Sequence, residues 1–175
     1  MTKQGRTKNI AVVIVDMQDF FLKKFKPEIL DALIKNHLVI IDFCIKNRLP
    51  FIVVEYKAGG KFRGKTIQKL DNRIKNVHKE TFIKEHNSAF TDTKLDEILK
   101  NLKTKEVLLI GINANACIQD TAIGALHRGY KVVTGHGIIA CTSRKDLELS
   151  KRNRKWYLKD TTYFDDIKGI LDYVG

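Results

Sequence analysis

Three residues of this chain offer a nucleophile, a base and a cation, and each stands next to an apolar run of strand length. Asp16 follows the run 9–15, and Lys84 closes the run 81–84. Cys117 follows the run 106–110 and a short loop, at the start of a predicted helix. A thiol attacks a carbonyl carbon efficiently when a base takes its proton. Together these residues predict a cysteine-dependent covalent enzyme.

The position of Cys117 at a helix start favours reactivity. Unpaired backbone N–H groups and the positive end of the helix dipole stabilise a thiolate, and the same amides can hold an anionic oxygen. Each residue also has a plainer interpretation. Cys117 could fill the core, Asp16 could cap a helix or lie on the surface, and Lys84 could be a surface lysine. The occurrence of all three at strand ends favours the catalytic interpretation.

Length and cysteine content predict the class of protein. The 175 residues suit one domain, 1–175, which removes roughly 70% of its unfolded surface from water. The cysteines are odd in number and sparse, without a CxxC pair, which favours a reducing, cytoplasmic compartment. Cys44 fits a structural role, and Cys141 lies near the predicted site without an assigned role. Neither a signal peptide nor an apolar run of membrane-spanning length is expected.

The chain is strongly basic, with a net charge of +12 and an isoelectric point near 9.6. Such a charge is compatible with a nucleic-acid or other polyanionic partner. The basic residues are scattered through 57–84 and 144–159 without a nucleic-acid-binding motif, so a solvated surface is favoured over nucleic-acid binding. An anionic substrate, or electrostatic steering of one, stays an alternative.

Hydrophobic periodicity predicts alternating strands and helices. The predicted strands are 9–15, 51–56, 81–84, 106–110 and 131–134; the predicted helices are 27–47, 93–102, 118–128, 143–158 and 165–173, with a loop at 57–80 that carries a short helix at 67–74. Such alternation predicts an α/β fold: a Rossmann-like three-layer α/β/α sandwich with a mostly parallel sheet of five or six strands. Ligands of these sheets bind at the carboxyl ends of the strands, where Asp16, Lys84 and the Cys117 loop meet.

Three segments resemble the isochorismatase-like cysteine hydrolases, which include nicotinamidases and other small-amide hydrolases. Residues 11–22 (AVVIVDMQDFFL) resemble the opening strand and D-x-Q-x-x-F segment of that family. Residues 84–95 (KEHNSAFTDTKL) resemble its K-x-x-x-S-A-F-x-x-T-x-L segment, and residues 111–129 resemble its nucleophile block. The resemblance covers nearly the whole chain.

The resemblance implies a catalytic triad of Asp16, Lys84 and Cys117. In the family, the aspartate accepts the thiol proton, the lysine balances charge and the thiolate attacks an amide-like carbonyl. The resemblance also implies a cis peptide bond between Ile112 and Asn113, with the amides of Asn113 and Cys117 forming an oxyanion hole; an ordinary trans loop is the alternative. A neighbouring ammonium and the helix start predict a lowered thiol pKa for Cys117.

Departures from the family pattern narrow the function. Metal-dependent nicotinamidases carry a D-x-H segment where this chain has Glu55-Tyr56-Lys57, and its histidines lack metal-ligand spacing, so we expect neither metal nor cofactor. His136-Gly137 replaces the usual acidic residue and alanine. Isochorismatase itself lacks the cysteine, so Cys117 favours hydrolysis of a small amide, ureido or carbamoyl compound. A catalytically silent or polyanion-binding member of the same fold is the alternative.

Aromatic side chains near the predicted strand ends are candidates to wall the substrate pocket, although core packing is the commoner role of any one aromatic. They are Phe21, Tyr56, Phe90 and Trp156. The family resemblance further implies a homo-oligomer, a dimer or a tetramer, that acts on a small molecule. Because no apolar run is long enough to span a membrane, no membrane partner is expected.

Overall fold

The computed structural model describes residues 9–142 and 160–175. The predicted helix at 143–158 and Trp156 lie outside the described residues. Among the described residues, no helix is both long enough and apolar enough to cross a membrane.

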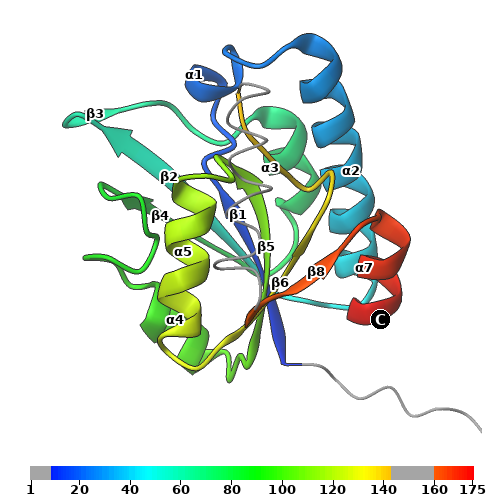
Figure 1. The fold of residues 1–175 in the computed structure, drawn as a ribbon. Helices are drawn as coiled ribbons and strands as arrows, with labels where there is room; N and C mark the ends of the chain where they lie inside the picture. The colour runs from blue at the N-terminus through cyan, green and yellow to red at the C-terminus, as the bar shows by residue number, and fades with distance from the viewer. Residues whose placement is uncertain (1–8, 143–159) are drawn as a thin grey trace, which may run out of the picture.

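A mostly parallel sheet forms the centre of the molecule, with only β3 antiparallel to its neighbour β2 among the described strands (Figure 1). Its strands run in the order β4-β2-β1-β5-β6-β8, and the short strands β3 and β7 pair with the ends of β2 and β5. The bounds are β1 Ile10–Val15, β2 Phe51–Ala58, β3 Lys61–Phe62, β4 Lys79–Lys84, β5 Glu106–Ile112, β6 Lys131–Gly135, β7 Ile139–Ala140 and β8 Thr162–Phe164. From β1 the chain moves outward to β2 and β4, then returns to β5 on the other side of β1. The strand order therefore reverses between β1 and β5, which is where parallel sheets place their ligands.

Helices cover both faces of this sheet (Figure 1). The helices α2 (Pro27–Lys46), α3 (Gln68–Ile74) and α7 (Ile167–Val174) pack on one face, and α4 (Leu95–Asn101) and α5 (Cys117–Leu126) on the other. A short helix, α1 (Asp19–Leu22), follows β1. Pro27 suits the first turn of α2, because its missing N–H has no acceptor there.

Alternation along the strands divides the core in two. In β1, the side chains of Val12 and Ile14 join the cluster under α2, whereas Val13 and Val15 join the cluster under α5. Successive side chains of a strand point to opposite faces, so a strand buried on both sides must be apolar throughout. All six residues of β1 are buried, which fixes this strand in the middle of the molecule.

The three-layer α/β prediction is confirmed, and the predicted elements within the described residues agree with the observed ones to within a few residues. The sheet has eight strands rather than five or six, because β3, β7 and β8 were not predicted. These strands have only two or three residues each. Hydrophobic periodicity needs longer segments, so strands this short give no signal.

Gly111 shows how closely the two central strands approach at the switch point. Its φ is +129°, and a Cβ atom there would lie 2.1 Å from the carbonyl oxygen of Val15. Only glycine fits a backbone approach of this kind. The ends of β1 and β5, and the residues that follow them, are therefore held side by side.

Candidate active site

Asp16 stands where β1 ends and the backbone turns. Its φ is +56°, in the left-handed region that few residues other than glycine and short polar residues adopt. Its N–H donates to the carbonyl of Val54 at 2.9 Å, and its own carbonyl accepts from the N–H of Gln18 at 2.7 Å. These bonds hold the strained backbone, and such strain is common at functional sites.

Lys84 closes β4 and is buried beside Asp16. Its Nζ lies 3.1 Å from Oδ2 of Asp16, and it donates to the carbonyls of His86 at 3.1 Å and Asn87 at 3.0 Å. The same Nζ lies 4.0 Å from the centre of the Tyr56 ring. A buried ammonium thus has a carboxylate, two carbonyls and an aromatic face around it, which compensates for the loss of water.

Cys117 is the first residue of α5, as expected from the sequence, and its side chain interacts with both Asp16 and Lys84. Its thiol also lies 3.9 Å from Oδ1 of Asn87, an exposed residue of the loop after β4. That loop is fixed to α5, because Oγ1 of Thr121 accepts from the N–H of Ala89 at 3.0 Å. The structure therefore brings the nucleophile, base and cation candidates into one group.

Burial controls the titration of the group. It raises the pKa of Asp16, although the Lys84 ammonium opposes this change. Burial, followed by the Asp16 charge, raises the pKa of Cys117 to about 12, again against the effect of Lys84. The expected lowering of the thiol pKa is therefore wrong, because loss of water and the Asp16 charge outweigh the effect of the Lys84 ammonium. At neutral pH Cys117 carries its proton.

The carboxylate of Asp16 has room for that proton. Its Oδ1 is buried and accepts no hydrogen bond from the described residues, whereas Oδ2 faces Lys84. A buried oxygen without a hydrogen-bond partner carries a free-energy penalty. Gaining a donor or a proton removes this penalty, so such an oxygen is a good acceptor. Together with the raised pKa, this makes Asp16 well suited to accept a proton from Cys117.

The loop between β5 and α5 contains a cis peptide bond between Ile112 and Asn113. The amide of Ala114 donates to the carbonyl of Ala140, and the amides of Ala116 and Ile118 both donate to the carbonyl of Asn113. No acceptor for the amides of Asn113 and Cys117 is found among the described residues. Two unused amides next to a thiol can hold a developing oxyanion.

The aromatic candidates separate into two places. Tyr56 stacks on Phe21, with ring centres 5.9 Å apart, and contacts Lys84 on the catalytic side. Phe90 instead stacks on Tyr130 and lies in the core with α5, where a Cβ on Gly124 would come within 3.0 Å of its ring. The structure therefore places Phe90 in the core cluster with α5, whereas Tyr56 contacts Lys84.

Gln18 is a site residue without an assigned role in the sequence analysis. Its side chain is fully buried, and its Nε2 donates to the carbonyls of Tyr56 at 3.2 Å and Gly64 at 2.5 Å. Its Oε1 accepts from the N–H of Tyr56 at 2.7 Å. One side chain thus ties both ends of the β2–β3 hairpin to the segment after Asp16. Asn87 was also missed, since a single asparagine in a loop carries no pattern.

The other two cysteines have different surroundings. Cys44 is buried in the core on α2, where burial raises its pKa to about 12. The thiol of Cys141 donates to Oδ1 of Asn115, at 3.3 Å, in the loop that leads to Cys117. Cys141 therefore lies next to the loop that leads to Cys117. Cys44 lies on the opposite face of the sheet, in the core cluster under α2.

Metal-ligating side chains do not gather in the described residues: no group of three or more His, Cys, Asp or Glu could hold an ion there. Glu55, in place of the first residue of the D-x-H segment, is buried and accepts from the N–H of Thr66 at 2.7 Å. Lys57, in place of the histidine, pairs with Glu85 at 2.7 Å.

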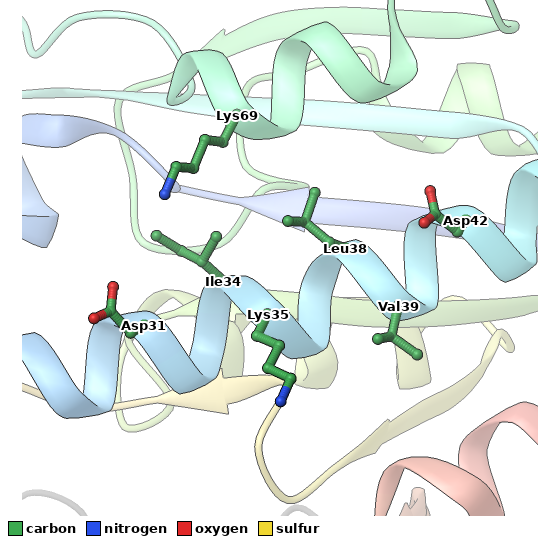
Figure 2. A pocket seen from close by; sticks show the side chains of 7 residues that line it. All are labelled: Asp31, Ile34, Lys35, Leu38, Val39, Asp42 and Lys69. Carbon is green, nitrogen blue, oxygen red and sulfur yellow. The ribbon is translucent and has the colours of Figure 1, made fainter.

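A separate shallow pocket lies between α2 and α3 (Figure 2). Its lining combines apolar, acidic and basic side chains, namely Asp31, Ile34, Lys35, Leu38, Val39, Asp42 and Lys69. These residues belong to α2 and α3, and none of Asp16, Lys84 and Cys117 is among them. We therefore place the chemistry at the Asp16–Lys84–Cys117 group.

A parallel sheet with a cysteine, a lysine and an aspartate at its switch point defines a class of α/β hydrolytic proteins, and comparison with known proteins agrees. The Isochorismatase domain family matches residues 10–152. Nicotinamidase 3 of Arabidopsis thaliana is 26% identical over 153 residues, which cover 74% of this chain and 72% of that protein. The chain belongs to the isochorismatase family, which confirms the resemblance seen in the sequence.

Solved structures share the fold. N-carbamoylsarcosine amidase from Thermoplasma acidophilum superposes with a TM-score of 0.75 at 23% identity, covering 89% of this chain and 95% of that one. The MAR1 ribonuclease of Caenorhabditis elegans superposes with a TM-score of 0.78 at 21% identity, covering 95% of this chain and 81% of that one.

Proposed function

We propose that this protein is a hydrolase that cleaves the C–N bond of a small amide, ureido or carbamoyl compound through a thioester on Cys117, without a metal. The observation that carries the proposal is the buried group of Asp16, Lys84 and Cys117 at the switch point of the sheet. Membership of the isochorismatase family and similarity to a nicotinamidase support an amide substrate.

The first step is attack on the substrate carbonyl. The thiol proton of Cys117 passes to the carboxylate of Asp16 as sulfur forms its bond to the carbonyl carbon. The raised pKa of Asp16 makes its carboxylate a stronger base, and the raised pKa of Cys117 keeps the proton on sulfur until the transfer occurs. The Lys84 ammonium offsets the negative charge that moves from Asp16 to the reacting centre.

The tetrahedral intermediate carries a negative oxygen. The unused amides of Asn113 and Cys117 donate to it. Its collapse breaks the C–N bond, and the proton on Asp16 passes to the leaving nitrogen, which departs as ammonia or a small amine. The acyl group remains on Cys117 as a thioester.

Hydrolysis of the thioester uses the same groups in reverse roles. Asp16, again a carboxylate, takes a proton from water as the oxygen attacks the thioester carbonyl. The same amides hold the second oxyanion, and the thiolate leaves and recovers its proton from Asp16. No step needs a metal ion, because proton transfer and oxyanion binding are both supplied by the chain.

A screen of primary amides, N-carbamoyl compounds and carbamates for ammonia release tests this function. We expect turnover of at least one compound by the wild type, no turnover by Cys117→Ala, and wild-type turnover by Cys44→Ala, which removes a thiol far from the site. Intact-mass spectrometry after rapid quenching should show the acyl group on the wild type and on Cys44→Ala, but not on Cys117→Ala.

Metal independence has its own control. Dialysis against EDTA, followed by assay in metal-free buffer, should leave the rate unchanged. A rate that disappears and returns with added zinc or iron, or full activity of Cys117→Ala, would refute the proposed mechanism.

A second candidate function is polyanion binding, favoured by the net charge of +12 and by the fold shared with a ribonuclease. Gel-shift assays with single- and double-stranded oligonucleotides at low and physiological salt separate the two candidates. Tight, salt-dependent binding would support the second function, since phosphate contacts release counterions.

A further inference from the structure

The segment from His136 to Ala140, which ends in β7, lies beside the loop that carries the proposed oxyanion hole. The amide of Gly111 donates to the carbonyl of Ile138, and the amide of Ala114 donates to the carbonyl of Ala140, both at 3.0 Å. Strand β7 also pairs in parallel with Gly111 and Ile112. The segment is therefore bonded to the nucleophile loop on both sides of the Ile112–Asn113 bond.

Helix α2 holds the same segment from behind. His37 contacts the carbonyl of Ile138 through Nε2 at 2.8 Å, and Nδ2 of Asn36 donates to the carbonyl of Gly137 at 3.0 Å. The Ile138 carbonyl thus accepts two hydrogen bonds, one from the imidazole of α2 and one from Gly111 of β5. A direct chain of contacts runs from α2, through Ile138, to the backbone of the nucleophile loop.

The protonation state of His37 makes its Nε2–H group a permanent hydrogen-bond donor to the Ile138 carbonyl. It is fully buried, and burial lowers its pKa to about 4, so the ring is neutral at pH 7. Because Nε2 faces a carbonyl, the single proton of the ring lies on Nε2. Nδ1 is buried without a hydrogen bond to the described residues. A histidine with one unpaired nitrogen is a costly way to fill a core, which favours a role for the bond that it does make.

We propose that His37 is a positioning residue of the oxyanion hole: its bond to Ile138 sets the place of the Asn113 amide through Gly111 and Ala114. This inference rests on the proposed function. Oxyanion donors act only when they lie at hydrogen-bond distance from the developing charge, so a small shift of the loop lowers the rate of attack. Substrate binding depends on the other residues that line the site, so we expect KM to change little.

The experiment compares His37→Leu with His37→Gln. Leucine fills the space without a donor, whereas the glutamine Nε2 can restore one. The probe is p-nitrophenyl acetate, whose ester carbonyl accepts the Cys117 sulfur while nitrophenolate leaves, so the nitrophenolate burst measures acylation. We expect a burst rate at least about tenfold lower in His37→Leu, with KM nearly unchanged and most of the rate recovered in His37→Gln.

Two controls separate positioning from general destabilisation. Cys44→Ala makes a cavity in the core on the same helix and should lower the melting temperature while leaving the burst rate intact. Alkylation of Cys117 by iodoacetamide needs no oxyanion hole and should proceed at the wild-type rate in His37→Leu. Asn36→Ala removes the neighbouring tie from a partly exposed position and should lower the burst rate in the same direction, which keeps the test valid if His37→Leu does not fold.

The outcomes are distinct. An unchanged burst in His37→Leu or, where it does not fold, in Asn36→Ala would overturn this inference and leave the proposed function standing. The inference would also be overturned if His37→Gln and Cys44→Ala lowered the burst rate by the same factor. A burst in Cys117→Ala equal to that of the wild type would instead overturn the proposed function itself.

Discussion

Nζ of Lys84 lies 3.1 Å from Oδ2 of Asp16, and the two side chains are 0% and 3% exposed. A buried ion pair of this kind is worth little compared with an apolar pair, yet removal of one partner leaves an uncompensated charge. We expect Lys84→Met to lower the free energy of unfolding by about 3–5 kcal/mol.

Urea unfolding of Lys84→Met, Asp16→Asn and the double variant measures this coupling. The double variant should lose less stability than the sum of the two single variants, because it contains no lone buried charge. Strictly additive losses would show that the two side chains do not interact.

Asp16→Asn should change catalysis and thiol reactivity in opposite directions. The variant lacks the proton acceptor, so hydrolysis should be lost. Because the Asp16 charge raises the pKa of Cys117 and Lys84 lowers it, the thiol should ionise more easily in the variant. Iodoacetamide labelling of Cys117 at pH 7–8, followed by peptide mass spectrometry, should therefore be faster than in the wild type, with Cys44 as the buried internal reference. Slower labelling would contradict the charge balance described for the site.

The acid limb of activity reports on Asp16. Burial raises its pKa above 3.8, and protonation removes the base, so kcat/KM should fall as the pH drops through this raised value. A profile measured between pH 4 and 8 should place the midpoint of the fall above that of an exposed aspartate. Activity that persists undiminished to pH 4 would exclude Asp16 as the base.

Activity should depend more on the charge than on the size of the side chain at position 87. Its Oδ1 lies 3.9 Å from the Cys117 sulfur. Asn87→Asp places a carboxylate there, which opposes thiolate formation and should lower kcat/KM on the order of tenfold. Asn87→Ala adds no charge and should lose less. Steady-state kinetics at low and high salt check the cause, since screening should reduce the effect at this exposed position.

Stability should depend on pH through His37. Its folded pKa of about 4 lies below the usual value of 6.5, so the unfolded chain binds more protons between these values. The free energy of unfolding should therefore fall as the pH drops from about 6.5 to 4, by on the order of 3 kcal/mol from this residue. His37→Gln should remove that part of the slope in urea unfolding at several pH values. An unchanged slope would contradict the burial of a neutral ring.

The elements of the fold and the members of the site were largely predictable because they depend on local patterns. The valine-rich run of β1 and the apolar spacing of α2 after Pro27 each specify an element, and parallel strands bring Asp16 and Lys84 to one edge. The contacts of Asn87 and His37 were not predictable, because they join segments distant in the sequence. The pKa of Cys117 was mispredicted for a related reason: the helix start is visible in the sequence, but the depth of its burial is not.

The Gln18 side chain fixes the two ends of the β2–β3 hairpin by hydrogen bonds to Tyr56 and Gly64. It holds Tyr56 and Gly64 in place, so the hairpin between them begins and ends at fixed points next to the reacting group. Loop closure depends only weakly on loop length once the ends are set. A longer or shorter hairpin should therefore leave the ends of β2 and the Asp16–Lys84–Cys117 group nearly where they are.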